Sequence, residues 1–188
     1  MNQKQQSYQQ FRLKTLCGIK CRKMGENAYF CTRKSNEREM SYPVGHFNCK
    51  LDAKGRLMIP SEFKEQLGAQ VEDGFVLRPG LHVTCLELYT RKDWDEVQDQ
   101  LRAAFSQFKA KQEAVLRKYN AGARFVKLDA SGRLQIPKDL IEKGALVKEI
   151  IITSVTTKME IWDKDLYEQS IDELDDEEFF NLLSENIK

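Results

Sequence analysis

Two short stretches of the chain carry the side chains best suited to bind or react with a ligand. Residues 51–60 read LDAKGRLMIP and residues 128–137 read LDASGRLQIP, so that eight of ten positions are identical. Each stretch places an aspartate four residues before an arginine. A carboxylate and a guanidinium at this spacing could take part in acid–base chemistry, form an internal ion pair, or present a cation to an anionic ligand. The chain thus contains two copies of one small unit.

Catalysis is the first chemistry that these residues could perform. Asp52 and Asp129 could act as a pair of carboxylates, one as acid and one as base. The arginine that follows each of them would lower its pKa and suit it poorly as an acid. The only histidines, His46 and His82, lie in neither a nucleophile motif nor a metal motif, and no glycine-rich phosphate-binding motif is present. We therefore expect no catalytic residue, no cofactor and no small-molecule substrate.

The five cysteines are candidates for metal ligands. Cys17, Cys21 and Cys31 follow the spacing C-x3-C-x9-C without a fourth ligand in register, which is a poor match to tetrahedral zinc. With Cys49 and Cys85 they make an odd number, and the first 30 residues lack the apolar run of a secretory signal. We predict free thiols, no metal site and a cytoplasmic location. No window approaches 18 consecutive apolar residues, so no membrane partner is expected.

The arginines are better explained as contacts to an anionic polymer. Arginine can bond with two nitrogens to O6 and N7 of guanine, and lysine can contact a phosphate. The net charge is only +1, with 30 Lys and Arg against 29 Asp and Glu, but the charges are segregated along the chain. Residues 1–43 carry a net +6, and residues 163–188 a net −8. A neutral total therefore does not argue against nucleic-acid binding.

Each aspartate–arginine stretch must be positioned by the strands on either side of it. In the first copy Phe47, Cys49 and Leu51 alternate with polar residues, which is typical of a half-buried strand. Gly55 can adopt a positive φ and so allows a tight reversal before the next strand. Both copies predict a β-turn-β-α-β-β unit. Its elements are residues 47–51, 57–59, 61–68, 75–77 and 85–89 in the first copy and 124–128, 134–136, 138–143, 149–153 and 158–162 in the second.

The segments between and outside the copies complete the predicted organisation. A unit of about 45 residues is too small to be stable alone, so the copies are expected to share one core. Between them, apolar residues recur at helical spacing from Trp94 to Phe108, with Thr90 as the cap. The acidic end contains an apolar stripe that we expect to dock on the body. The predicted segments are a basic, mostly disordered extension (1–43), a first module (46–91), a helical connector (92–122), a second module (123–166) and an acidic helical tail (167–188).

The two D-x-x-x-R turns, each followed by the strand end L-x-I-P, resemble those of the MraZ family, and residues 160–162, Glu-Ile-Trp, fit the same pattern. The resemblance spans roughly residues 44–170. It implies an α+β fold in which tandem SpoVT/AbrB-like β-turn-β-α-β-β modules form a swapped-hairpin β-barrel with a connecting helix. It also implies a ring-shaped homo-oligomer that binds double-stranded DNA at repeated promoter elements. The family regulates the division and cell-wall gene cluster, so the resemblance implies a nucleoid-associated transcriptional regulator of that cluster, including its own gene.

The chain departs from the family pattern at its amino end. Members of the family usually begin a few residues before the first strand, and Met40 fits that usual start. Residues 1–39 are either a lineage-specific extension or the product of an upstream start codon, and both alternatives stay open.

If the turns face DNA, their arginines are expected to read bases and their lysine to contact phosphate. The aspartates are expected to accept turn N–H groups or to orient the arginines, because a carboxylate beside DNA is repelled. The alternative is an oligomeric interaction scaffold without DNA binding, in which the aspartate–arginine pairs only brace the hairpins. The predicted DNA-binding residues are Lys50, Lys54, Arg56, Arg124, Lys127, Ser131 and Arg133, and the predicted turn-bracing residues are Asp52, Gly55, Asp129 and Gly132.

Overall fold

The computed structural model describes residues 20–23, 29–32 and 43–187, and the chain divides into two units, residues 1–39 and 40–188. In the first unit β1 (Lys20–Lys23) and β2 (Tyr29–Thr32) form an antiparallel pair. The sequence predicted a mostly disordered extension over residues 1–43 and did not predict this pair of strands. Apart from the two strands, residues 1–42 lie outside the described residues.

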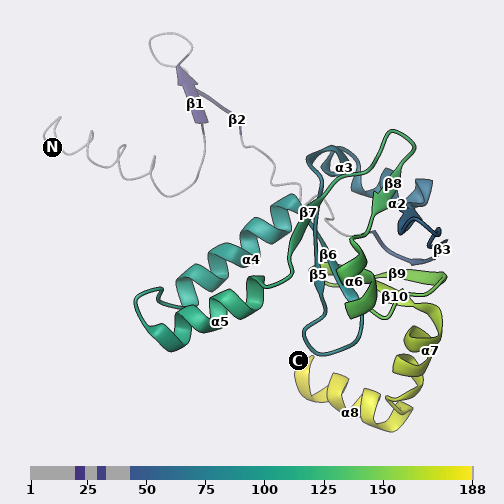
Figure 1. Ribbon diagram of the computed structural model, residues 1–188. Helices are drawn as coiled ribbons and strands as arrows, with labels where there is room; N and C mark the ends of the chain where they lie inside the picture. Colours follow the sequence, from purple (N-terminus) through teal and green to yellow (C-terminus); the bar gives the residue numbers. More distant parts are fainter. Residues whose placement is uncertain (1–19, 24–28, 33–42, 188) are drawn as a thin grey trace, which may run out of the picture. The chain divides into compact units, whose positions relative to one another are not determined.

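The second unit has an α+β fold, as the sequence predicts (Figure 1). Its strands are β3 (His46–Lys50), β4 (Arg56–Met58), β5 (Phe75–Pro79), β6 (Leu86–Thr90), β7 (Arg124–Val126), β8 (Arg133–Gln135), β9 (Glu149–Val155) and β10 (Lys158–Asp163). Its helices are α2 (Ser61–Leu67), α3 (Gln70–Asp73), α4 (Arg91–Ala104), α5 (Ala110–Asn120), α6 (Lys138–Lys143), α7 (Lys164–Asp172) and α8 (Asp176–Asn186). The predicted elements of both copies agree with these bounds to within two residues, and the short α3 was not predicted.

The strands of the two copies are exchanged between them. A six-stranded sheet has the order β3-β9-β10-β6-β5-β7, and every pairing in it is antiparallel. The first strand of the first copy, β3, pairs with β9 of the second copy, and the first strand of the second copy, β7, pairs with β5 of the first. The second strands of the two copies, β4 and β8, pair with each other in a separate two-stranded sheet. Neither copy is therefore a self-contained unit.

The expected closed barrel is wrong. The described strands leave the large sheet open, with β3 and β7 as its edges. A single bridge, Leu51 to Leu57, connects β3 to β4, and another, Leu128 to Leu134, connects β7 to β8. A tight turn lies between the two residues of each bridge, and the backbone groups next to the bridge bond to one another within that turn. No ladder of hydrogen bonds between the described strands extends from either bridge to close the sheet.

One hydrophobic core is shared by both copies, in agreement with the prediction from their size. Leu57 of β4 lies opposite Leu134 of β8, and both side chains are completely buried. Phe63 of α2 and Leu140 of α6 occupy the same cluster, together with Ile152 of the large sheet. Because each copy contributes residues to the same buried volume, burial of apolar surface holds the two copies together.

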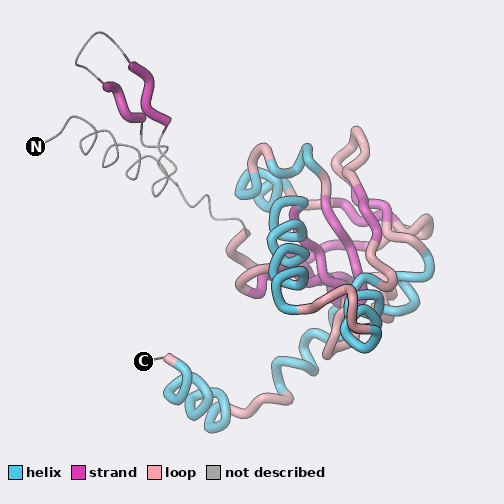
Figure 2. Tube along the Cα trace, turned by 90° about the vertical axis from the view of Figure 1, so that its left-hand side faces the viewer, coloured by secondary structure: helices cyan, strands magenta, loops and turns pink. Residues whose placement is uncertain are grey.

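Helices cover the other face of the large sheet (Figure 2). Trp94 of α4 packs against Val76 and Tyr89, and α7 covers Trp162. The predicted cap of α4 is confirmed, because the side-chain oxygen of Thr90 accepts a hydrogen bond from the backbone N–H of Asp93 at 3.2 Å.

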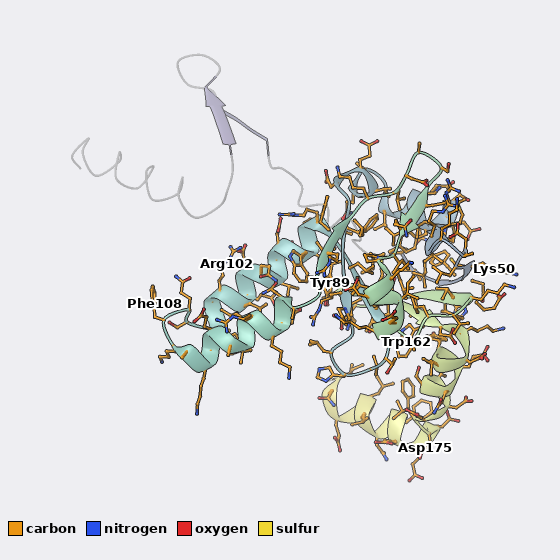
Figure 3. The ribbon with its side chains drawn as sticks, viewed as in Figure 1. Lys50, Tyr89, Arg102, Phe108, Trp162 and Asp175 are labelled. Atoms are coloured by element: carbon orange, nitrogen blue, oxygen red, sulfur yellow. The ribbon has the colours of Figure 1, made fainter. Side chains whose placement is uncertain are left out.

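The helical connector between the copies consists of two helices, α4 and α5. Figure 1 shows α4 and α5 side by side, and the side-chain amide of Gln98 donates to Asn120 across them at 3.0 Å. The apolar spacing predicted a helix that includes Phe108, and this prediction is wrong, because α4 ends at Ala104. Phe108 lies in the loop between the helices with 89% of its surface exposed and points away from the sheet (Figure 3).

The acidic tail does form helices, but its predicted docking is wrong. Every residue of α8 is exposed, including Phe180 at 65%. The sheet face that an apolar helix could cover is already occupied by α4 and α7.

Charged side chains are buried where β6 and β10 pair. Glu87 lies directly opposite Glu160, and both are buried. The ammonium of Lys158 contacts both carboxylates, at 3.1 Å from Glu160, and Arg78 Nη1 lies 3.5 Å from Glu87 Oε2. The hydroxyl of Tyr89 donates to the same Glu87 oxygen at 3.1 Å. The two like charges are therefore held together by the two cations beside them.

Candidate nucleic-acid interface

The first D-x-x-x-R turn, residues 52–56, is built around one carboxylate. Asp52 Oδ1 accepts hydrogen bonds from the backbone amides of Lys54 and Arg56, each at 2.9 Å. The other oxygen, Oδ2, accepts from Arg56 Nε at 2.8 Å. The backbone amide of Gly55 donates to the Asp52 carbonyl at 2.9 Å. The aspartate thus fixes both the turn and the direction of the arginine side chain.

The second turn, residues 129–133, repeats this arrangement. Asp129 Oδ1 accepts from the amides of Ser131 and Arg133 at 2.8 and 3.0 Å, and Oδ2 accepts from Arg133 Nε at 2.9 Å. Arg133 Nη2 also donates to the Ser131 hydroxyl at 3.3 Å. The two turns differ mainly in that hydroxyl, which has no counterpart at Lys54.

Both turns need glycine before the arginine. Gly55 has a φ of 76° and Gly132 a φ of 75°, in the left-handed region that side chains with a Cβ rarely adopt. A β-carbon on Gly55 would also lie 3.1 Å from the carbonyl oxygen of Ile136. The sequence prediction of a positive φ at Gly55 is confirmed.

The antiparallel β4–β8 pair places each turn beside the strand end of the opposite copy, so the two turns lie at opposite ends of this short sheet. The amide of Ile136 donates to the Gly55 carbonyl at 2.8 Å, and the amide of Ile59 donates to the Gly132 carbonyl at 3.2 Å. Each turn is therefore anchored to the strand end of the opposite copy. The pairing is symmetric about Leu57 and Leu134, because Arg56 lies opposite Gln135 and Arg133 lies opposite Met58.

The arginines have nitrogens left for a ligand. Each uses Nε to bond its aspartate, and the side chains are 28% exposed at Arg56 and 31% at Arg133. The two Nη groups form the edge of guanidinium that can donate two parallel hydrogen bonds to one acceptor group or base. An arginine held in this way has already lost much of its side-chain freedom, so a ligand would find it preoriented.

The hydrogen bonds of the turns determine how the aspartates titrate. The backbone amide of Arg56 lowers the pKa of Asp52 most, desolvation opposes it, and the Arg56 side chain and the Lys54 amide lower the pKa further. The pKa of Asp129 is lowered by the same groups of its own turn. A lowered pKa stabilises the fold above the ordinary pKa of aspartate, and this contribution is lost as the pH falls through the lowered value.

We expect carboxyl carbon NMR titrations of Asp52 and Asp129 to give midpoints below the ordinary aspartate value. In the Arg56→Ala variant the midpoint for Asp52 should rise only part of the way back, because two backbone amides still donate to it. The Asp129 midpoint in the same variant serves as the control and should stay unchanged. A wild-type midpoint at or above the ordinary value would contradict the hydrogen-bonding scheme.

The other predicted DNA-binding residues flank the turns and have varied surroundings. Lys50 points into solvent from β3 (Figure 3), with its ammonium 3.3 Å from Glu149. Arg124 Nη2 lies 3.5 Å from Asp139, and the Lys127 ammonium lies over the ring of Phe125 at 5.8 Å. Exposed ion pairs of this kind contribute little to stability, so these cations can exchange their partners for a phosphate.

Sequence reasoning missed three residues at the turns, because each comes from the opposite copy. The side-chain amide of Gln135 donates to the carbonyls of Lys54 and Gly55 at 3.0 and 3.1 Å. Ile141 of α6 packs on the first turn, and Lys64 of α2 reaches the second. Met58 and Gln135 occupy the same position of the repeat, which is one of the two positions at which the copies differ. This difference is the sequence signal that could have identified Gln135.

The two described cysteine side chains are free thiols. Cys49 and Cys85 are both buried, and burial raises the pKa of Cys49 to about 11 and that of Cys85 to about 12. The side chains of the other three cysteines lie outside what the structure describes. Among the residues that the structure describes, no three His, Cys, Asp or Glu side chains are grouped as metal ligands would be. In that same part of the chain, no helix has the length and apolar character to cross a bilayer.

Comparison with known proteins identifies the family. The chain matches the family described as "MraZ protein, putative antitoxin-like" twice, over residues 44–118 and 120–188. It is 42% identical over 134 residues to "Transcriptional regulator MraZ" of Flavobacterium psychrophilum, which covers 71% of this chain and 85% of that protein. The protein of the same name from Christiangramia forsetii is 41% identical over 142 residues, which cover 76% of this chain and 90% of that protein. The one from Clostridium acetobutylicum is 37% identical over 134 residues, which cover 69% of this chain and 89% of that protein. The chain therefore belongs to the MraZ family.

Proposed function

We propose that this protein is a sequence-specific DNA-binding transcriptional regulator that reads promoter DNA through its two D-x-x-x-R turns. The observation that carries the proposal is the arrangement shared by the two turns, in which an aspartate binds Nε of the arginine and the side chain of Arg56 or Arg133 stays 28% or 31% exposed. The name of the relatives, a transcriptional regulator, supports the same function.

The residues of the turns are expected to contact different parts of the DNA. The Nη groups of each arginine would donate to O6 and N7 of a guanine in the major groove. Lys54 is exposed at the tip of the first turn and would contact a phosphate, while Ser131 at the equivalent place keeps its hydroxyl on Arg133. Around them, Lys50, Lys127 and Arg124 would add phosphate contacts that fix the register of the protein without reading bases.

We further propose that the protein works as a ring-shaped homo-oligomer of such swapped-hairpin units. Two turns contact too few bases for selective binding, and a symmetric ring repeats the same turns along DNA. Repeated promoter elements of the division and cell-wall gene cluster, including the promoter of the protein's own gene, would be the targets, and the protein would be nucleoid-associated in the cytoplasm.

The proposal is tested by fluorescence anisotropy with two DNA duplexes at several salt concentrations. One duplex comes from upstream of the protein's own gene (the upstream duplex), and the other has the same bases in shuffled order (the shuffled duplex). We expect tighter binding to the upstream duplex and a steep loss of affinity for both as salt rises. Equal affinity for the two duplexes would contradict specific reading. An absence of binding by a protein that light scattering shows to be oligomeric would favour the interaction scaffold.

A further inference from the structure

The helices α2 and α6 each contribute one residue to the turn of the opposite copy. Lys64 and Ile141 occupy equivalent positions in these helices, 77 residues apart, the same offset as between the two turns. A β-carbon on Gly55 would lie 2.9 Å from Cδ1 of Ile141, and a β-carbon on Gly132 would lie 2.7 Å from Nζ of Lys64. The side chain at this helix position therefore lies directly against the glycine of the turn.

The two turns obtain a lysine from different places. The first turn carries Lys54 within its own sequence and has the apolar Ile141 beside it. The second turn has Ser131 in place of that lysine, and here the neighbouring helix brings the ammonium of Lys64. Each turn thus has one aspartate, one arginine and one lysine ammonium. The substitution of lysine by serine within the repeat is compensated by a lysine on the other copy.

The surroundings of Lys64 leave its charge available. Its side chain is half-buried along α2 while Nζ reaches the second turn. Within residues 43–187, no carboxylate oxygen lies within 4.0 Å of this ammonium, whereas Lys50 and Lys143 both have such a partner. A lysine ammonium that is held against the turn and has no carboxylate within ion-pair distance is suited to an anion that approaches from outside.

We propose that Lys64 is a phosphate-binding residue of the second turn, supplied by the first copy to the DNA interface. This inference rests on the proposed function, since its ligand is the DNA backbone beside the base that Arg133 reads. The ammonium binds a phosphate without carrying sequence information and releases a counterion on binding.

The test compares Lys64→Gln with Lys118→Gln, which removes the same charge from an exposed site on α5. We expect Lys64→Gln to weaken binding to the upstream and the shuffled duplex by similar factors. The slope of log affinity against log salt should become shallower by about 0.9 for each phosphate that the variant no longer neutralises. Lys118→Gln should leave both slopes unchanged, and circular dichroism should show equal melting temperatures for the two variants.

A second variant moves the charge back to the turn. Ser131→Lys combined with Lys64→Gln gives the second turn the arrangement of the first, and we expect it to restore the wild-type salt slope. If Lys64→Gln behaves like Lys118→Gln, or weakens binding to the upstream duplex alone, the inference is overturned. The proposed function is tested separately by Arg133→Ala. If that variant also binds both duplexes like the wild type, the proposed function fails, and if it loses specific binding, only the role of Lys64 is rejected.

Discussion

Replacing Arg56 or Arg133 with alanine is expected to weaken binding to the upstream duplex by about 1–3 kcal/mol for each arginine, which corresponds to roughly five- to 150-fold in affinity. Each arginine side chain is partly exposed, at 28% and 31%, while its aspartate fixes Nε. Alanine removes both donors to the base but leaves the backbone hydrogen bonds that close the turn. Binding to the shuffled duplex should change much less, so specificity should fall together with affinity.

Arg102→Ala is the matched control for this prediction, because Arg102 is exposed on α4 and its ion-pair partner among the described residues is Asp99 of the same helix, at 2.6 Å. It should leave the ratio of the two affinities unchanged, as measured by fluorescence anisotropy at fixed salt. A ratio unchanged in both turn variants, with the fold intact by circular dichroism, would show that the arginines only brace the hairpins.

Replacing Glu87 with alanine is expected to lower the free energy of unfolding by about 3–5 kcal/mol, because one partner of a buried charge cluster is removed. Glu87 is 1% exposed and is bonded by Tyr89 and Lys158. Nε and Nη1 of the buried Arg78 guanidinium have no hydrogen-bond partner among the described residues. Loss of Glu87 also removes the carboxylate that lies beside this guanidinium. A charge left in this position has neither water nor a counterion.

The control for this prediction is Glu149→Ala, which breaks the exposed pair with Lys50. Because exposed pairs are screened and flexible, it should cost less than about 1 kcal/mol. Urea unfolding of both variants at one protein concentration measures the difference, since assembly makes stability depend on concentration. Similar losses in the two variants would mean that Glu87 is reached by water.

Much of the fold could be predicted because it depends on short-range patterns. The alternation at Phe47 and Cys49 specifies a strand, and the cap at Thr90 is a bond between residues three positions apart. Helix α6 was predicted at its observed bounds because the second copy repeats the pattern of the first. The prediction failed at Phe108, because apolar spacing alone does not show where a helix ends when no capping residue marks the position.

The sequence by itself determined the two turns, because their hydrogen bonds join residues two to four positions apart. Asp52, Gly55 and Arg56 contain everything that the reversal needs, and the second copy repeats it. Only the tertiary structure decided which residues surround these turns. Strand exchange brings Lys64 to residue 132 and Gln135 to residue 55, and these approaches follow from packing both copies into one core. No local pattern encodes such approaches, because each of them joins residues about 70 to 80 positions apart that meet only when burial of the shared core brings the two copies together.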